Sequence, residues 1–187
     1  MAENDDNSTL NNIVAVLVAI TATFMALCNI KDGNITQAMA QAQANAVDAW
    51  SYYQSKSTKQ NLAEAVLDQL TVQRDFATAG PARDALDKKV AAYEASVKRY
   101  ESEKAEIKAK AEGYQKAYDA LNVHDDQFDM SDAAFSVALA ILGITALTKK
   151  KWLFAVAIAF LLFGFFFGSA GFFGWSVHPD FIAQWLS

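Results

Sequence analysis

The densest cluster of side chains that could do chemistry lies late in the chain, where residues 124–126 (His-Asp-Asp) are followed by Asp129 and Asp132. Histidine and carboxylate groups are common metal ligands. The spacing, however, lacks the central glycine and the terminal glutamate of a calcium-binding EF-hand loop. We therefore predict no metal site here. We expect a solvated break before an apolar helix, with Ser131 or Asp132 capping the start of that helix.

The sequence motifs of the common enzyme classes are absent from the 187 residues. There is no Gly-x-Ser-x-Gly, phosphate-binding loop, dinucleotide fingerprint or His-Glu-x-x-His. The single cysteine, Cys28, excludes an intramolecular disulfide framework and a cysteine-cluster zinc site. A net charge of -5 gives no basic surface for nucleic acid. We therefore predict a protein that is not an enzyme, holds no cofactor and binds no nucleic acid.

Three stretches of the chain are long and apolar enough to span a lipid bilayer as helices. We therefore predict an all-α protein, whose helices position any functional side chains. A cleaved signal peptide is an alternative for the first stretch, but residues 1–12 contain no Lys or Arg. A lipoprotein site at Cys28 is disfavoured by Leu27 before it. We predict a polar tail at residues 1–12 and transmembrane helices at residues 13–30, 132–148 and 152–176.

The orientation of these helices is predicted from the loop at residues 149–151, which consists of Lys149, Lys150 and Lys151. Short loops rich in lysine stay in the cytoplasm. The amino terminus is then also cytoplasmic, and the long middle region and an interfacial tail at residues 177–187 lie outside. In bacteria this corresponds to a multi-pass protein of the inner membrane with a periplasmic middle region.

The middle region, residues 31–131, is predicted to be an antiparallel helical hairpin. Both sides of Gly80-Pro81 are rich in helix-forming residues, and this pair suits the end of one helix and the start of the next. The arms are expected at residues 36–78 and 81–122 with a turn at 79–81. Folding about Gly80 places residue i near residue 160 − i.

The second arm carries a heptad pattern that predicts a coiled-coil seam. One polar residue, Lys104, interrupts it. The tyrosines of this seam suggest either helix packing, with hydroxyl groups at the solvent edge, or a binding platform, and we favour packing. The predicted seam residues are Leu86, Val90, Tyr93, Val97, Tyr100, Ile107, Tyr114, Tyr118 and Leu121.

Each predicted transmembrane helix has small residues along one face, which permit close contact between helices in lipid. These faces could pack within one chain or between copies, and the sequence leaves both open. The small residues are Ala15, Ala19, Ala22 and Ala26 in the first helix, Ser136, Ala140 and Gly143 in the second, and Gly164, Gly168, Gly171 and Gly174 in the third.

Two motifs resemble those of a bacterial family of small membrane proteins known only as a domain of unknown function (number 4337). One is the aromatic and lysine-containing stretch at residues 48–60. The other starts with Phe-Asp-Met at residues 128–130 and ends with the lysine triplet and Trp152. The resemblance extends from about residue 12 to 173. It implies a membrane architecture and a bacterial setting, but no activity, substrate or cofactor.

The resemblance also draws attention to one candidate ligand or partner region near the start of the hairpin. The preferred interpretation is helix packing near the membrane, with lysine stems along the helix and ammonium groups in water. A ligand or partner site is the alternative. The residues are Trp50, Tyr52, Tyr53, Gln54, Lys56 and Lys59.

These observations together predict a structural, scaffolding or accessory subunit of a membrane assembly, either a homo-oligomer or part of a larger complex. A transporter is disfavoured because the cores of the three apolar stretches contain no ionisable side chain. An oligomeric channel, with Thr21 and Thr23 near its pore, is the main alternative. A sensor that uses the region of residues 50–59 is a third hypothesis.

Overall fold

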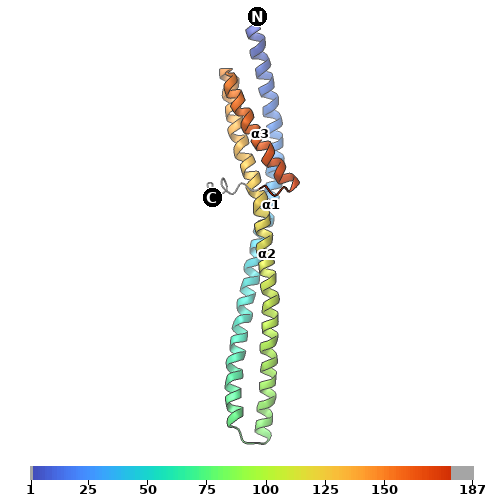
Figure 1. The fold of residues 1–187 in the computed structure, drawn as a ribbon, viewed down its shortest axis with the longest axis vertical. Helices are drawn as coiled ribbons and strands as arrows, with labels where there is room; N and C mark the ends of the chain where they lie inside the picture. The colour runs from blue at the N-terminus through green and yellow to red at the C-terminus, as the bar shows by residue number, and fades with distance from the viewer. Residues whose placement is uncertain (1, 178–187) are drawn as a thin grey trace. The chain divides into compact units, whose positions relative to one another are not determined.

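The computed structural model describes residues 2–177, with side chains from residue 8 onward, and is all-α in this range (Figure 1). Three helices and no strand are present in the described residues: α1 (Ala2–Phe76), α2 (Pro81–Thr148) and α3 (Lys151–Phe173). The predicted all-α fold is confirmed. Most of the predicted interfacial tail, residues 178–187, lies outside the described residues.

The chain forms two compact units. The first, here called the three-helix unit, comprises the described parts of Met1–Ala40 and Asp119–Ser187. The second, here called the two-helix unit, is Gln41–Tyr118. Its first arm is the part of α1 from residue 41 to 76, and its second arm is the part of α2 from residue 81 to 118.

The break predicted at residues 124–132 does not exist, because α2 is continuous through this segment. Ser131 does not cap a helix: its side chain is buried, and its hydroxyl donates to the Gly164 carbonyl oxygen at 2.9 Å. Gln127 and Phe128 are also buried. Packing therefore overrides the weak local preference of aspartate and serine for helix ends. α1 is likewise uninterrupted at residues 31–35, between the first two predicted segments.

The three-helix unit is held together where α3 lies directly on aromatic side chains of the other helices. A Cβ atom placed on Gly164 would lie 2.7 Å from the ring of Phe135, and one on Gly171 would lie 2.7 Å from the ring of Phe128. Only glycine permits so close an approach. Leu142, Phe135 and Leu161 complete a buried core beside these contacts.

Three residues with a positive φ angle lie next to helix ends, namely Gly80, Lys149 and Gly174. Gly80, before the start of α2, has a φ of 148°, which favours glycine. Lys149 has a φ of 55° and donates its backbone N–H to Thr145 O at 2.7 Å, so that α3 follows α2 after a very short turn. Gly174 ends α3 with a φ of 67° and bonds back to Ala170 O.

The two-helix unit has a narrow core, in which few apolar side chains are buried. The arms run in opposite directions, as Lys56 contacts Glu103 and Arg74 approaches Asp87 (Figure 1). In both pairs the partner of residue i lies within one position of residue 160 − i, as the predicted fold about Gly80 requires. The buried apolar residues of this unit are Ala42, Ala46, Ala63, Val90, Ile107 and Ala111.

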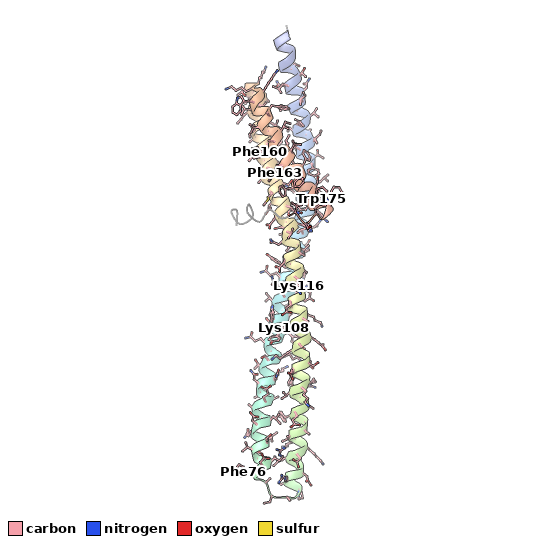
Figure 2. All side chains as sticks on the ribbon, in the orientation of Figure 1. Phe76, Lys108, Lys116, Phe160, Phe163 and Trp175 are labelled. Carbon is pink, nitrogen blue, oxygen red and sulfur yellow. The ribbon has the colours of Figure 1, made fainter. Side chains whose placement is uncertain are left out.

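All three helices contain a stretch long and apolar enough to cross a membrane, judged by length and composition alone. In α1 only 17% of the most apolar stretch is buried, so most of this surface faces outward. Large apolar side chains are exposed on all three helices of the three-helix unit, among them Ile20 on α1 and Ile144 on α2. On α3, Phe163 is likewise exposed (Figure 2).

Candidate functional site

The acidic residues near the end of the predicted first transmembrane helix form a cluster across α1 and α2 of the three-helix unit. Asp32 of α1 lies close enough to Asp125, Asp129 and Asp132 of α2 to interact with them electrostatically. The Thr36 hydroxyl, one turn further along α1, lies 3.0 Å from Asp125 Oδ1 and 3.1 Å from Asp32 O. The α2 members are close together in the sequence and were predicted as a cluster, whereas nothing in the local sequence marks Asp32 as their neighbour.

Burial and the neighbouring carboxylates change the protonation of this cluster. Desolvation, followed by repulsion from Asp125 and Asp129, raises the pKa of Asp32 to about 6. The pKa of Asp129 is also raised, first by desolvation and then by the neighbouring aspartates. Asp32 Oδ1 is buried and has no hydrogen-bond partner. At neutral pH, Asp32 is therefore an ionised carboxylate in an unfavourable position.

The side chains of this cluster were also compared with the geometry of a metal site. Across the described side chains, no three His, Cys, Asp or Glu residues are arranged to hold a metal ion. His124, the only imidazole in the predicted cluster, instead has its Nδ1 atom 3.1 Å from Gln127 Oε1.

Neutralising Asp32 is expected to stabilise the protein at neutral pH. Its folded pKa, about 6, lies above its ordinary value of 3.8, so the folded state binds this proton more tightly than the unfolded state. The stabilisation that protonation provides is full below pH 3.8 and is lost as the pH rises through 6. Asp32→Asn mimics the protonated form. Allowing for solvent screening, we expect a gain of about 1 kcal/mol at pH 7.5, or roughly 2–4 °C in melting temperature.

Thermal melts of wild type and Asp32→Asn at pH 4 and pH 7.5 test this expectation. The difference should be present at pH 7.5 and vanish at pH 4. Asp68→Asn, at an exposed position of the two-helix unit, is the control for a general loss of negative charge. Equal effects of the two substitutions at pH 7.5 would contradict the account of Asp32.

A second polar contact fastens the end of α3 to α2. The Gln127 side chain is fully buried, and its Nε2 atom donates to Trp175 O at 2.8 Å and to Val177 O at 2.6 Å. These carbonyl groups follow the end of α3 and have no partner within the helix, so the amide satisfies them. Gln127 was not predicted as a functional residue, because a single glutamine beside aspartates resembles a solvated position.

In the two-helix unit, Lys56 contacts the second arm. Its Nζ atom lies 2.6 Å from Glu103 Oε2 and above the rings of Tyr52 and Tyr100, at 5.2 Å and 5.7 Å from their centroids. The hydrogen bond from Lys56 lowers the pKa of Glu103, and the same bond raises the pKa of Lys56. Glu103 was not among the predicted residues, and no local pattern distinguishes it from other glutamates of the second arm.

The structure does not bring the predicted ligand region together at one site. Tyr53 and Lys56 are directed to the second arm, where Lys104 Nζ lies 5.2 Å from the centroid of the Tyr53 ring. Trp50 contacts Tyr53 edge-on but remains 41% exposed. Of the other predicted residues, Tyr52, Gln54 and Lys59 are exposed.

Two open grooves lie between the arms of the two-helix unit. One, of about 470 Å³, is lined by residues that include Lys59, Leu62 and Tyr93. The other, of about 330 Å³, is lined by residues that include Asp48, Tyr52 and Ile107. Each contains both apolar and polar side chains of the two arms. The predicted ligand residues are thus distributed over two grooves and the seam.

The predicted seam residues differ in burial. Val90 and Ile107 are buried, whereas Tyr114 is 38% exposed. Leu121 belongs to the three-helix unit and is half-buried. The remaining seam residues are half-buried in the two-helix unit: Leu86, Tyr93, Val97, Tyr100 and Tyr118.

The small-residue faces of the three helices also differ in burial. On α3, Gly164, Gly168 and Gly171 are buried against neighbouring helices, while Gly174 is the residue that ends the helix. The faces on α1 and α2 remain on the surface: Ala15, Ala19, Ala22, Ala26, Ser136, Ala140 and Gly143 are all exposed.

The threonines considered for a pore are placed differently from each other. Thr21 is fully buried in the three-helix unit, and its hydroxyl has no hydrogen-bond partner. Thr23 is exposed, and its hydroxyl donates to Ala19 O at 2.8 Å within α1. The basic loop of Lys149, Lys150 and Lys151 is exposed between α2 and α3.

The sequence model of one protein family matches residues 10–174 of the chain, and that family is described as a domain of unknown function (DUF4337). The match confirms the resemblance seen in the sequence motifs. No curated protein and no solved structure matches the chain.

Proposed function

Since the chain belongs to the DUF4337 family, whose description assigns no activity, we propose a function from its structure. The protein is a non-enzymatic integral membrane protein that acts as a scaffold or accessory subunit by self-assembly. Its three-helix unit spans a bacterial inner membrane, and its two-helix unit is a coiled-coil hairpin outside the bilayer.

The membrane part of this proposal is supported by the exposed apolar surface of the three-helix unit. Water-soluble monomers rarely expose apolar patches larger than a few hundred Å². Here Ile20, Ile144 and Phe163, on three different helices, are exposed together with many other large apolar residues. Surrounding lipid removes this surface from water, and the helical backbone leaves few unsatisfied polar groups inside the bilayer.

The topology follows from the loop of Lys149, Lys150 and Lys151, which should remain in the cytoplasm. A membrane-impermeant thiol reagent tests it in spheroplasts of cells that express single-cysteine variants in a Cys28→Ala background. A cysteine at Ala79, in the turn between the arms, should be labelled, and one at Lys150 should not. Labelling of the Lys150 variant alone would show that the topology is inverted.

Self-assembly is the central part of the proposal, and one observation carries it. Of the three small-residue faces, the one on α3 is used within the chain, whereas those on α1 and α2 remain exposed. In lipid, faces of this kind promote helix association because they let backbones approach closely. Contact between copies would bury both remaining faces.

Co-purification of differently tagged copies tests self-assembly. With both copies expressed together, capture of one should recover the other from mild detergent. Ala19→Leu combined with Ala26→Leu should reduce the recovered fraction several-fold, because the larger side chains keep the helices apart. The control Ile13→Phe adds bulk at an exposed position on the other side of α1 and should have little effect.

Absence of co-purification by the wild-type protein would contradict self-assembly. The same preparations distinguish the alternative function, an oligomeric channel. After reconstitution into liposomes, the scaffold should give no ion flux above that of protein-free vesicles. Flux that Ala19→Leu abolishes would favour the channel instead.

A further inference from the structure

The two arms of the hairpin differ in the chemistry of their exposed surfaces. About half of the exposed residues of the second arm are charged. On the first arm, the only exposed charged residues are Asp48, Lys59, Asp68 and Asp75. Exposed large apolar residues show the opposite distribution. The second arm has only Tyr114, whereas the first arm has Val47, Trp50, Tyr52, Leu62, Val72 and Phe76, which are 41 to 86% exposed.

Most of these apolar residues lie on one side of the first arm. At about 100° per residue, Val47, Leu62, Val72 and Phe76 fall within an arc of about 80°. Small side chains lie between them on the same arc at steps of seven residues. We call this surface the first-arm face, and it consists of Ala44, Val47, Ser51, Thr58, Leu62, Ala65, Val72 and Phe76, all of which are exposed.

The arc contains no charged residue: its other members in the first arm are Gln54 and Gln69. Figure 2 shows Phe76 at the end of the first arm, and Lys108 and Lys116 on the second arm. A stripe of large and small side chains without charge is suited to another helix rather than to water. Except for Leu62, which also borders the groove lined by Lys59 and Tyr93, the face is not used inside the hairpin. The seam of the hairpin lies on another side of α1 and includes Ala46, Tyr53 and Ala63.

We propose that the first-arm face is the docking surface for the first arm of a second copy of this chain. This inference rests on the self-assembly proposed above and names the surface that carries it outside the membrane. The face is self-complementary, since large residues such as Leu62 can fit into the spaces left by small ones such as Thr58 and Ala65. It is also uncharged, so two equal faces meet without like-charge repulsion.

The size of the face supports a second copy. The first arm spans 36 residues, or about 54 Å of helix. A contact strip of about 10–12 Å width would bury roughly 540–650 Å² on each copy, near the lower limit for a specific interface. Two copies in one membrane are held at high effective concentration, so an interface of this size suffices.

The shared membrane also fixes the relative direction of the arms. Two copies inserted with the same topology are related by a two-fold axis perpendicular to the membrane. First arms that extend along this axis run parallel, and each residue on the line of contact then meets its own counterpart. The second arms remain on the outside of this pair, which agrees with their charge.

Disulfide cross-linking in membranes tests the inference, since a disulfide needs Cα atoms about 4.4–6.8 Å apart. Single cysteines replace Ser51, Thr58 or Ala65 in a Cys28→Ala background, and matched controls replace Ala95 or Ala109, exposed on the second arm. After mild oxidation, at least one first-arm cysteine should give at least ten times more covalent dimer than either control.

A second measurement uses charge instead of cysteine. Leu62→Lys combined with Ala65→Lys should lower the dimer fraction in mild detergent at least tenfold. The control Ala95→Lys with Ala109→Lys should leave it unchanged. Circular dichroism verifies that both variants keep their helices.

The outcomes separate the two proposals. Cross-linking confined to the first arm, with dissociation by the Leu62 and Ala65 substitutions, supports the inference. A wild-type oligomer that survives these substitutions and forms no first-arm dimer overturns the inference but leaves self-assembly standing. Cross-links from the first arm to a different protein in cells also overturn it. A wild-type protein that is only monomeric overturns both proposals.

Discussion

Replacing Gly168 with leucine is expected to disrupt the packing of α3 in the three-helix unit. A Cβ atom at this position would lie 2.7 Å from Phe24 Cε1, 2.8 Å from Ser131 Oγ and 3.1 Å from Cys28 Sγ. Ser131 has little freedom to move because its hydroxyl donates to Gly164 O. The leucine therefore enters a space already filled from α1 and α2.

Overpacking of this kind usually costs about 1–3 kcal/mol, and a residue in contact with two helices should reach the upper part of this range. We expect a fall of roughly 5–10 °C in the melting temperature of the detergent-solubilised protein. Gly33→Leu is the matched control, since Gly33 is exposed on α1 outside the small-residue faces and nothing lies within 4 Å of a Cβ atom placed on it. Wild type and both variants are melted at one scan rate. Similar melting temperatures for the two variants would show that α3 does not pack as described.

The second large effect is expected in the two-helix unit, when Ile107 is replaced by alanine. Ile107 is one of the few large buried side chains of this unit. Removing a buried isoleucine costs about 2–5 kcal/mol, from the lost burial and the cavity that remains. The core of a two-helix unit is thin, so this loss should be a large fraction of its stability.

Hydrogen exchange measured along the intact chain detects this loss where it occurs. Amide protection should fall by at least tenfold in both arms together and remain unchanged in α3. Lys108→Ala is the control: it alters the next residue of the same helix, at an exposed position on the second arm (Figure 2). Loss of protection in the second arm alone, with the first arm unaffected, would contradict cooperative packing of the two arms.

Some of the structure could be predicted because its signals are local. The glycine and proline at residues 80 and 81 mark a helix boundary in any context, and α2 indeed begins at Pro81. The heptad pattern likewise arises from helix geometry alone, and it includes Val90 and Ile107, which are buried. Apolar composition identified the three helices that are able to cross a membrane.

Other features depend on residues that are distant in sequence and leave no local signal. The segment at residues 124–132 was predicted to be a break because aspartate and serine favour helix ends. Contact with α1 and α3 keeps it helical, as the buried Gln127 and Ser131 show. Asp32 and Glu103 gain their importance only from partners on another helix, Asp125 and Lys56 respectively.

The small-residue faces illustrate the same limit. The small residues have equivalent spacing in all three helices. The pattern therefore predicts that each face can pack against another helix, but it does not predict which helix that is. In the structure Gly164 lies against Phe135, whereas Ala19 on α1 and Ala140 on α2 are exposed. Which face is used depends on the path of the chain between helices. That path is set by turns such as the one at Lys149.

The central claim is that this protein acts by assembling with itself in a membrane. Native mass spectrometry of the full-length protein, extracted in mild detergent and measured at several concentrations, tests it most directly. We predict particles whose mass is an integer multiple of one chain, two or more, and that persist on dilution. A spectrum that contains the mass of a single chain alone would contradict the claim.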